Sequence, residues 1–343
     1  MFKSEDIDRL RHILRTFGSF VLVTHVNPDG DAIGSMQGFA TFLRVLGRRV
    51  HTITPNAYPD FLSFLDGPKG AHILIYKYHQ KVCERLLSEA DVIVCLDMNR
   101  TSRMETLGSF ITKLDHPKVL IDHHPDPEHN EFDLIFSNPQ TSSTCEWIYR
   151  IICALDMVSP FPQAVVEPLF AGIMADTNNF SNSVSADTLD AAAECMRLGV
   201  DKERVQQQIF GNFSEDRMRL MGYAVHHQMV VVQKYRAAYI MLSLKEQEQF
   251  NFRIGDTEGF VNIPLSIKGV DLSMLFVETP DYIRVSLRSQ NGVDVNEMAK
   301  KFFNGGGHRS ASGGKLFCPL VDLPDLILHA LKESFEEVSC SLA

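Results

Sequence analysis

Aspartates and histidines gather after the apolar runs of this sequence, at the points where the runs end. They come from four separate segments rather than from one acidic stretch. Carboxylates packed together without compensation repel one another and raise their own pKa values. A divalent cation is the usual remedy, and mixed aspartate and histidine ligation suits Mn²⁺, with Mg²⁺, Co²⁺ or Zn²⁺ as alternatives. The residues that predict such a metal site are His25, Asp29, Asp31, Asp97, Asp122, His123, His124 and Asp176.

The segments that carry these residues alternate between strand and helix patterns. Short apolar runs predict strands, and helical spacing of apolar residues predicts helices, one of which ends near Asp176. This alternation indicates a mostly parallel, doubly wound α/β sheet. Because ligands of such sheets bind beyond the carboxyl ends of the strands, we expect the acids and imidazoles to share one edge. The predicted strands are 20–24, 50–54, 91–96 and 118–121, and the predicted helices include 31–46 and the stretch around 165–174.

Each residue of the set has an ordinary explanation when it is taken alone. His25 at a strand end could be a structural hydrogen-bonding group, and residues 27–30 have the composition of a turn. Asp31 could cap the helix that follows it. Turn chemistry does not require so many acid and imidazole groups at one edge, however. Taken together, the residues favour a metal site.

The pattern changes after about residue 212. Residues 214–229 predict a single connecting helix with Ser214 as its N-cap and acidic residues in its first turn. The strands and helix expected beyond it, which indicate a second and smaller α/β domain, are 237–242, 272–277, 282–287 and 295–303. The expected organisation is a catalytic metal-binding domain (1–212), a connecting helix (213–229) and a substrate-binding domain (230–343).

Composition excludes several classes of protein. The 343 residues are 45% hydrophobic and 22% charged, as in a globular chain of about two domains and unlike a disordered or collagen-like one. No apolar run reaches the ~18 residues that a membrane helix needs, and the N-terminus lacks the apolar core of a signal peptide. We therefore expect a cytoplasmic protein. A net charge of −10 disfavours long duplex nucleic acid, because phosphate neutralisation supplies most of that affinity.

Several motifs resemble those of one known family. The segments HVNPDGDAIGS (25–35), LDMNR (96–100), IDHH (121–124) and MADTNNF (174–180) are similar, in order and spacing, to the successive motifs of the DHH phosphoesterases. The segment FFNGGGHRSASGG (302–314) resembles the signature of the associated DHHA1 domain. The compact length and the stretch TSSTCEWIY (141–149) most resemble the NrnA branch, which comprises oligoribonucleases and pAp phosphatases. The resemblance implies two α/β domains joined by a helix, with the active site in the cleft, and a homodimer is plausible from the family.

The resemblance implies a role for each residue of the metal set. It implies two divalent cations, Mn²⁺ before Mg²⁺ or Co²⁺, that share Asp97 as a bridging ligand. His124 is implied to face the substrate phosphate and to assist the leaving oxygen, and Asp122 to orient the histidines. A hydroxide between the two cations would attack phosphorus in line, without a serine or cysteine nucleophile. The implied ligands are His25, Asp29 and Asp97 for the first cation, and Asp31, Asp97, His123 and Asp176 for the second.

Substrate binding is predicted for the second domain. A glycine triplet could form a nest of backbone N–H groups around a phosphate, and the two basic residues that follow it would add charge. An arginine in a predicted strand matches a family arginine that contacts phosphate or base. Taken alone, the triplet would suit a flexible hinge better than a phosphate nest. The residues concerned are Arg288, Gly305, Gly306, Gly307, His308 and Arg309.

The sequence departs from the family pattern in two places. Asn178 stands where the family has a glycine, although Asp176 and Phe180 are kept. Asparagine tolerates positive φ better than most residues, so we expect a local adjustment rather than a lost site. In the DHHA1 signature, residues 309–312 replace a more alanine-rich stretch, and the extra arginine could alter substrate contacts.

The leading hypothesis is a Mn²⁺-dependent phosphodiesterase that hydrolyses short oligoribonucleotides of about two to five residues to mononucleotides, and also pAp to AMP. A pocket that grips one terminal phosphate beside the metals favours such short substrates. Alternatives are hydrolysis of cyclic or linear signalling dinucleotides, of pyrophosphate or polyphosphate, and a RecJ-like exonuclease, for which the chain lacks an added DNA-binding domain. A non-catalytic nucleotide sensor is a hypothesis of another class, and the intact ligand set argues against it.

Overall fold

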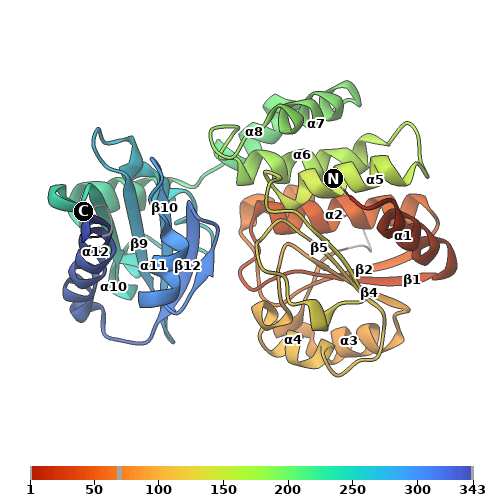
Figure 1. Cartoon of the computed structure of the whole chain (residues 1–343), viewed down its shortest axis with the longest axis horizontal. Coiled ribbons are helices and arrows are strands. Elements are labelled where there is room, and N and C mark those ends of the chain that lie inside the picture. The colour runs from red at the N-terminus through yellow and green to blue at the C-terminus, as the bar shows by residue number, and fades with distance from the viewer. Residues whose placement is uncertain (1, 68–71, 341–343) are drawn as a thin grey trace. The chain divides into compact units, whose positions relative to one another are not determined.

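The computed structural model of the chain describes residues 2–67 and 72–340. The chain divides into two compact units, Met1–Asn212 and Phe213–Ala343, each with its own six-stranded sheet and core (Figure 1). Among the helices of the described residues, none combines the length and apolar character that crossing a bilayer requires.

The sheet of the N-terminal unit is entirely parallel. Its strand order is β3-β2-β1-β4-β5-β6, so the order reverses between β1 and β4. Every residue of β1 and of β4 is buried, because helices cover both faces, and this explains the uninterrupted apolar runs. The strands are β1 (Ser19–Val23), β2 (Arg49–Thr54), β3 (Leu74–Ile75), β4 (Val92–Leu96), β5 (Lys118–Asp122) and β6 (Leu134–Ser137).

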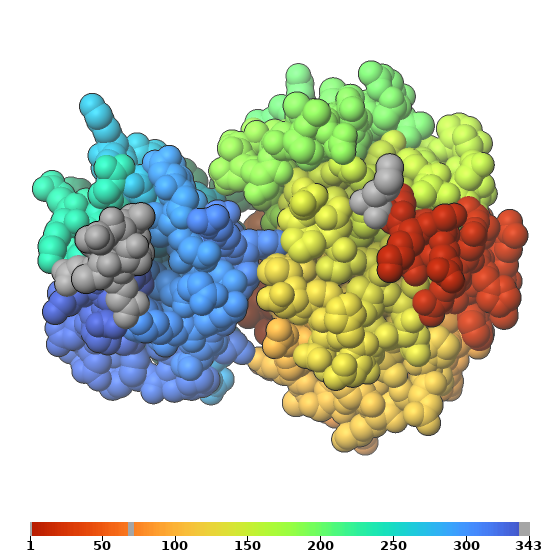
Figure 2. All heavy atoms as spheres, viewed as in Figure 1, coloured from red at the N-terminus to blue at the C-terminus, as the bar shows by residue number. Residues whose placement is uncertain are grey.

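Two helical layers enclose this sheet (Figure 1). On one face, Leu22 and Val94 pack in a core shared with α2, α5 and α6; on the other, Val21 and Ile93 pack against α3 and α4. Figure 2 shows α1 on the outside of the unit. The helices are α1 (Ser4–Thr16), α2 (Gly30–Val45), α3 (Tyr76–Glu89), α4 (Thr106–Ile111), α5 (Thr144–Leu155), α6 (Gln163–Asp176), α7 (Ala186–Arg197) and α8 (Lys202–Phe210).

The sheet of the C-terminal unit is mixed. Its order is β11-β12-β10-β9-β8-β7, and among these neighbours only β8 and β9 run parallel. One face packs against α11 and α12 around Phe276 and Phe303, and the other packs against α9 around Leu275 and Phe260. The elements are α9 (Glu215–Tyr223), β7 (Met229–Val232), β8 (Ala237–Leu242), α10 (Leu244–Gln249), β9 (Leu272–Glu278), β10 (Ile283–Ser289), α11 (Val295–Phe302), β11 (Gly306–Gly307), β12 (Ala311–Leu316) and α12 (Leu323–Cys340).

The predicted fold class is confirmed: a doubly wound parallel sheet precedes a smaller α/β unit. The strands expected in both units form within two residues of their predicted ends. The segment expected as one connecting helix begins with the predicted Ser214 cap, whose hydroxyl accepts from the Arg217 N–H. It forms α9 and then a π-helical turn, Ala224–Gln228, before β7 begins.

Candidate active site

The carboxyl ends of β1, β4 and β5 form the edge where the strand-borne residues meet. This edge includes the point where the strand order reverses, which is where ligands of open α/β sheets bind. His25 follows β1, and Asp97 follows β4 directly. Asp122 is the last residue of β5 and precedes His123 and His124.

Two helices deliver the remaining acids to this edge. Asp29 caps α2, because its Oδ1 accepts the N–H groups of Asp31 and Ala32 at 3.0 and 3.1 Å. Asp31 lies in the first turn of the same helix, and Asp176 is the last residue of α6. Asp31 is thus a buried carboxylate at a helix N-terminus, where backbone dipoles favour negative charge.

Besides the group of Asp97, Asp122 and His124, these side chains form two groups in which the potential ligand atoms lie within 4.8 Å of one another. In the first, His25 Nε2 lies 3.3 Å from Asp97 Oδ2. In the second, His123 Nε2 lies 3.8 Å from Asp31 Oδ2 and 3.7 Å from Asp176 Oδ2. The same nitrogen lies 3.7 Å from Asp97 Oδ1, so Asp97 faces both groups. The groups are His25, Asp29 and Asp97, and Asp31, His123 and Asp176.

Burial and neighbouring charges set the pKa values in the second group. Burial, together with the Asp97 and Asp176 carboxylates, raises the pKa of Asp31 well above its usual range. Burial alone would lower the pKa of His123, but the surrounding carboxylates outweigh it and raise that pKa to about 9. Burial also opposes ionisation of Asp97, yet the imidazoles beside it hold its pKa well below the usual range. The buried carboxylates therefore favour positive charge at this edge of the sheet.

The donor set fits a pair of divalent cations. His25 Nδ1 lies 2.9 Å from the Val26 carbonyl oxygen, which favours the tautomer with its proton on Nδ1 and leaves the Nε2 lone pair for a cation. Carboxylate oxygens and imidazole nitrogens suit Mn²⁺, Mg²⁺ or Co²⁺. Bound cations would supply the positive charge that the buried carboxylates demand. The assignment of each residue as a ligand stays a prediction, which is taken up below.

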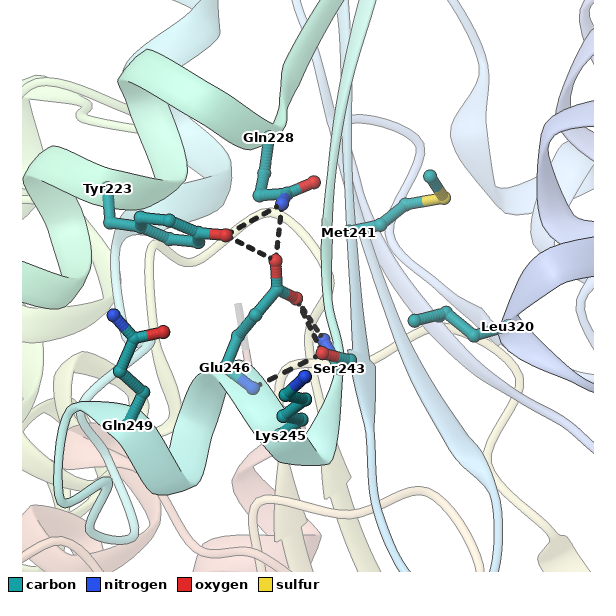
Figure 3. Close-up of a pocket in the computed structure, with 8 residues that line it drawn as sticks. All are labelled: Tyr223, Gln228, Met241, Ser243, Lys245, Glu246, Gln249 and Leu320. Atoms are coloured by element: carbon teal, nitrogen blue, oxygen red, sulfur yellow. Dashed lines mark hydrogen bonds between the residues drawn. The ribbon is translucent and has the colours of Figure 1, made fainter.

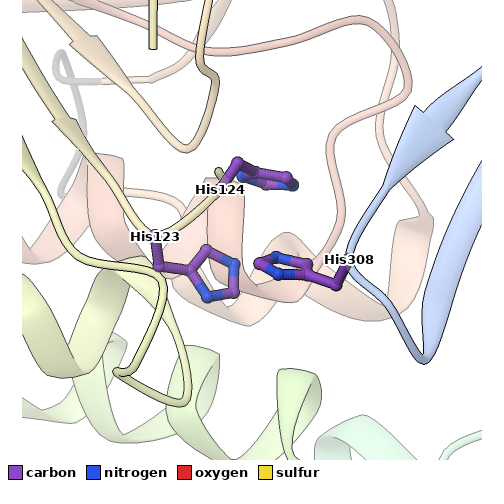
Figure 4. A group of neighbouring side chains, drawn as sticks. All are labelled: His123, His124 and His308. Atoms are coloured by element: carbon purple, nitrogen blue, oxygen red, sulfur yellow. The ribbon is translucent and has the colours of Figure 1, made fainter. Parts of the chain in front are cut away.

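His124 and Asp122 form a hydrogen-bonded pair next to these groups. His124 Nδ1 lies 2.8 Å from Asp122 Oδ1, and the Asp122 side chain is fully buried. The His124 ring stands at 75° to that of His123, with 4.8 Å between the ring centroids (Figure 4). Burial and the nearby Arg103 charge lower the pKa of His124, so its neutral form predominates near pH 7. Asp122 thus fixes the orientation of one of the two neighbouring histidines.

Two family models match the chain. The DHH family, N-terminal domain, matches residues 19–174, and the DHHA1 domain matches residues 233–337. The chain belongs to the DHH family. The resemblance drawn from its motifs is therefore confirmed, and so is the order of the two domains along the chain.

Relatives of this DHH protein resemble it over almost its whole length. The bifunctional oligoribonuclease and PAP phosphatase NrnA of Bacillus subtilis is 28% identical over 94% of this chain and 96% of its own. The protein of the same name from Thermus thermophilus is 27% identical over 92% and 90%. These relatives, with the two family domains, make this DHH protein a phosphoesterase, and hence a hydrolase.

Solved structures show the same fold. An exopolyphosphatase-related protein from Bacteroides fragilis is 37% identical, with a TM-score of 0.89 and 96% of each chain covered. RecJ from Thermus thermophilus, solved in complex with Mn²⁺, is 13% identical, with a TM-score of 0.57 over 96% of this chain and 54% of RecJ. The RecJ comparison supports the fold alone.

Small residues let α2 and α6 approach closely enough to bring their acids together. A Cβ on Gly30 would lie 2.4 Å from Ala175 Cβ, and one on Gly34 would lie 2.5 Å from the Pro168 carbonyl oxygen. A Cβ on Gly38 would lie 2.5 Å from Leu169 Cδ2. Only glycine fits at such distances, so the glycines set the separation of the two helices. That separation in turn sets the distance between the acids of α2 and α6.

The backbone of this DHH protein is left-handed at two points of the site. Asp97 has a φ of 59°, so the backbone leaves the extended conformation directly after β4. Asn178, Asn179 and Phe180 follow with φ values of 48°, 56° and 61°. The expectation for Asn178 is confirmed, because asparagine adopts the positive φ at the position where the family has glycine.

Sequence reasoning missed two residues of the site. The first, Arg103, lies in the 3₁₀ turn Thr101–Met104. Its backbone carbonyl accepts the Val26 N–H at 2.9 Å, and its guanidinium donates to the Asp97 carbonyl oxygen at 3.5 Å. Its charge acts on both His25 and His124. Thr144, at the start of α5, donates its hydroxyl to Asp97 Oδ1 at 3.0 Å. An arginine in a turn and a threonine in a serine-rich segment carry no local signal of such contacts.

In the C-terminal unit, the predicted substrate residues lie on neighbouring strands and the loop between them. Arg288 on β10 pairs with Ala311 at the start of β12, and β11 consists of Gly306 and Gly307. Arg309 keeps a side chain that is 73% exposed, near Asp294. Arg309 therefore lies at the surface, whereas Arg288 and His308 are half-buried, and the contact of all three with substrate stays a prediction.

The amides of the glycine triplet have a different use from the one predicted. Gly305, Gly307 and His308 donate their N–H groups to acceptors of the same unit at 3.1, 3.0 and 2.7 Å. A Cβ on Gly305 would lie 1.8 Å from the Gly313 carbonyl oxygen. The glycines are thus required by the close approach of β12, and these three amides do not form an open nest.

A separate pocket of the C-terminal unit surrounds Glu246 (Figure 3). The Glu246 carboxylate accepts the Tyr223 hydroxyl at 2.8 Å and the Ser243 N–H at 2.8 Å, and it also accepts the Gln228 amide. These bonds fix the π-helical turn and the start of α10. None of the predicted substrate residues lines this pocket, whose lining residues are Tyr223, Gln228, Met241, Ser243, Lys245, Glu246, Gln249 and Leu320.

Proposed function

We propose that this protein hydrolyses short oligoribonucleotides, of about two to five nucleotides, to mononucleotides, and pAp to AMP, with two divalent cations. The observation that carries the proposal is the pair of ligand groups at the sheet edge. Asp97 belongs to the first group and also lies close to His123 of the second. The relatives named as oligoribonuclease and PAP phosphatase support the substrate class. Mn²⁺ is the proposed cation, with Mg²⁺ or Co²⁺ as substitutes.

The proposed ligands divide between the two groups. His25, Asp29 and Asp97 would hold one cation, and Asp97 would bridge to the second. The second cation would also be held by Asp31, His123 and Asp176. When bound, such a pair supplies a nucleophile from water at neutral pH and neutralises charge on the phosphoryl group.

The chain's own residues would then handle charge and protons. Asp122 holds the His124 ring through Nδ1, and His124 would face the substrate phosphate and assist the leaving oxygen. Arg103 is the cation of the N-terminal unit that acts on both His25 and His124, and it would stabilise negative charge on the phosphoryl oxygens. In the C-terminal unit, Arg288, His308 and Arg309 would bind the terminal phosphate or base.

Product analysis with Mn²⁺ tests the proposal. The substrates are pApA, a five-nucleotide RNA, an RNA of about 24 nucleotides, pAp and a cyclic dinucleotide, offered side by side. We expect rapid conversion of pApA and the five-nucleotide RNA to mononucleotides, slower change of the long RNA, and AMP from pAp. Turnover of the cyclic dinucleotide alone would replace the proposal with a signalling function.

Polyphosphate is a necessary further substrate in the same assay, because a 37% identical relative is named as exopolyphosphatase-related. Release of phosphate from polyphosphate without cleavage of any oligonucleotide would favour that activity instead. Binding of nucleotide with no turnover of any substrate would favour a sensor. Excess chelator should abolish every activity, and added Mn²⁺ should restore it.

A further inference from the structure

The segment Thr141–Trp147, which comprises the end of the β6–α5 loop and the first turn of α5, supplies hydrogen bonds to two of the proposed ligands. The Thr144 N–H donates to Asp31 Oδ2 at 2.7 Å, and the Cys145 N–H donates to Asp31 Oδ1 at 2.9 Å. The Thr144 hydroxyl donates to Asp97 Oδ1 at 3.0 Å. Thr144 is fully buried, so these bonds are shielded from solvent. One residue therefore contacts carboxylates from α2 and from the end of β4.

The first turn of α5 uses its unpaired amides on Asp31. The opening N–H groups of a helix have no partner within the helix and take other acceptors. Here the Ser143 hydroxyl caps the Glu146 N–H, while the amides of Thr144 and Cys145 bind the two oxygens of Asp31. A carboxylate oxygen has two lone pairs, so each oxygen of Asp31 retains one for a cation.

The Thr144 hydroxyl distinguishes the two oxygens of Asp97. It binds Oδ1, which lies 3.7 Å from His123 Nε2, whereas Oδ2 lies 3.3 Å from His25 Nε2. Rotation of the carboxylate would break the hydroxyl bond. The β-branched threonine has few rotamers in a helix, so its hydroxyl is held in place. Asp97 thus presents one oxygen to each ligand group in the metal-free protein.

Glu146 holds this turn from the side opposite the ligands. It is fully buried and accepts the Ser142 N–H at 3.0 Å and the Thr188 hydroxyl of α7 at 2.9 Å. It also pairs with Arg150 on the next turn of α5. Both oxygens of Glu146 are therefore engaged, and the position of Thr144 is fixed by α5 and α7 as well as by the two carboxylates.

We propose that Thr144 is a positioning residue, whose hydroxyl sets the orientation of Asp97 and so prepares the site for two cations. The inference rests on the proposed function, because the orientation of Asp97 matters only if both ligand groups take cations. It gives a physical role to the segment TSSTCEWIY, which the sequence shows only as a family resemblance.

Calorimetric titration of the metal-free full chain with Mn²⁺ tests this inference. Thr144→Val removes the hydroxyl and keeps the shape, and Thr144→Ser keeps the hydroxyl. We expect Thr144→Val to bind Mn²⁺ about 10- to 100-fold more weakly, and Thr144→Ser to stay within about threefold of the unmodified chain. The matched control is Thr141→Val, which makes the same change at a hydroxyl that donates to the Asn138 carbonyl oxygen at 2.9 Å. It should bind Mn²⁺ normally.

Each other outcome has a definite meaning. Unchanged Mn²⁺ affinity in Thr144→Val would overturn the inference, and so would an equal loss in Thr141→Val. Thermal unfolding of the metal-free variants separates positioning from folding, because a positioning role predicts similar midpoints for Thr144→Val and Thr144→Ser. An unmodified chain that binds Mn²⁺ but cleaves none of the phosphoesters would overturn the proposed function and leave the role of Thr144 intact. An unmodified chain that binds no Mn²⁺ would overturn both.

Discussion

The close approach of α2 and α6 predicts that one added methyl group will disturb the metal centre from a distance. Gly34→Ala places a Cβ 2.5 Å from the Pro168 carbonyl oxygen and 3.1 Å from Gly172 Cα. Both atoms belong to the backbone of α6, so neither can rotate away. An ordinary contact is about 3.4 Å or more, and the helices must therefore separate locally by roughly 1 Å.

The expected magnitude is the difference between two opposing effects. Overpacking a well-packed core costs typically about 1–3 kcal/mol, while alanine gains up to about 1 kcal/mol over glycine inside a helix. The free energy of unfolding should fall by about 1–2 kcal/mol, which lowers the melting temperature by about 2–8 °C in a unit of this size. Because Asp31 lies one turn from Gly34, and Asp176 one turn from Gly172, Mn²⁺ affinity should fall about tenfold as well.

Calorimetry measures both quantities on the same protein, by thermal unfolding and by Mn²⁺ titration. The control is Gly222→Ala in α9, where an added Cβ meets no atom within 4 Å. This control should melt at the same temperature or slightly higher and bind Mn²⁺ normally. A Gly34→Ala chain that matches the unmodified protein in both measurements would refute the claim that helix separation sets the geometry of the acids.

Three further predictions concern single side chains. Asp97→Asn keeps the shape of the side chain and tolerates the left-handed backbone, but it removes the negative charge. Titration should therefore show weakened binding of both Mn²⁺ ions. Turnover should fall by more than the ~100-fold loss that is typical when a residue supporting a ligand is replaced. Arg103→Ala should lower kcat/KM for pApA about 100-fold. The control Arg100→Ala removes an exposed side chain from the same segment and should leave kcat/KM unchanged. Equal effects of the two substitutions would contradict the role given to Arg103. Phe303→Ala removes a fully buried ring whose centroid lies 5.7 Å from that of Phe276, and it should cost about 3–5 kcal/mol of unfolding free energy. Mn²⁺ titration should stay normal, because the proposed ligands belong to the other core; a loss of Mn²⁺ affinity would contradict this expectation.

Much of the N-terminal unit was predictable because its determinants are local. Strands buried on both faces produce unbroken apolar runs, so β1 and β4 appear directly in the sequence. The parallel order then brings their carboxyl ends together, and with them His25 and Asp97. The left-handed backbone at Asn178 agrees with an expectation that rested on the glycine of the family pattern and on the tolerance of asparagine for positive φ.

The remaining features depend on contacts between distant segments. Thr144 reaches residues 113 and 47 positions away, at Asp31 and Asp97, and no local pattern records such a contact. The glycine triplet resembles a phosphate nest in sequence. Composition cannot show that β12 lies so close to Gly305 that a Cβ atom there would clash with it. Sequence thus predicted where the acids and imidazoles leave the sheet, but not what holds them in orientation.

The left-handed backbone at Asp97 also restricts how this protein can change over evolutionary time. Asparagine and glycine keep the conformation at little cost, whereas a β-branched or bulky residue strains the turn as well as removing the carboxylate. A descendant that lost catalysis yet kept the fold would therefore pass through asparagine or glycine at this position far more readily than through valine or leucine.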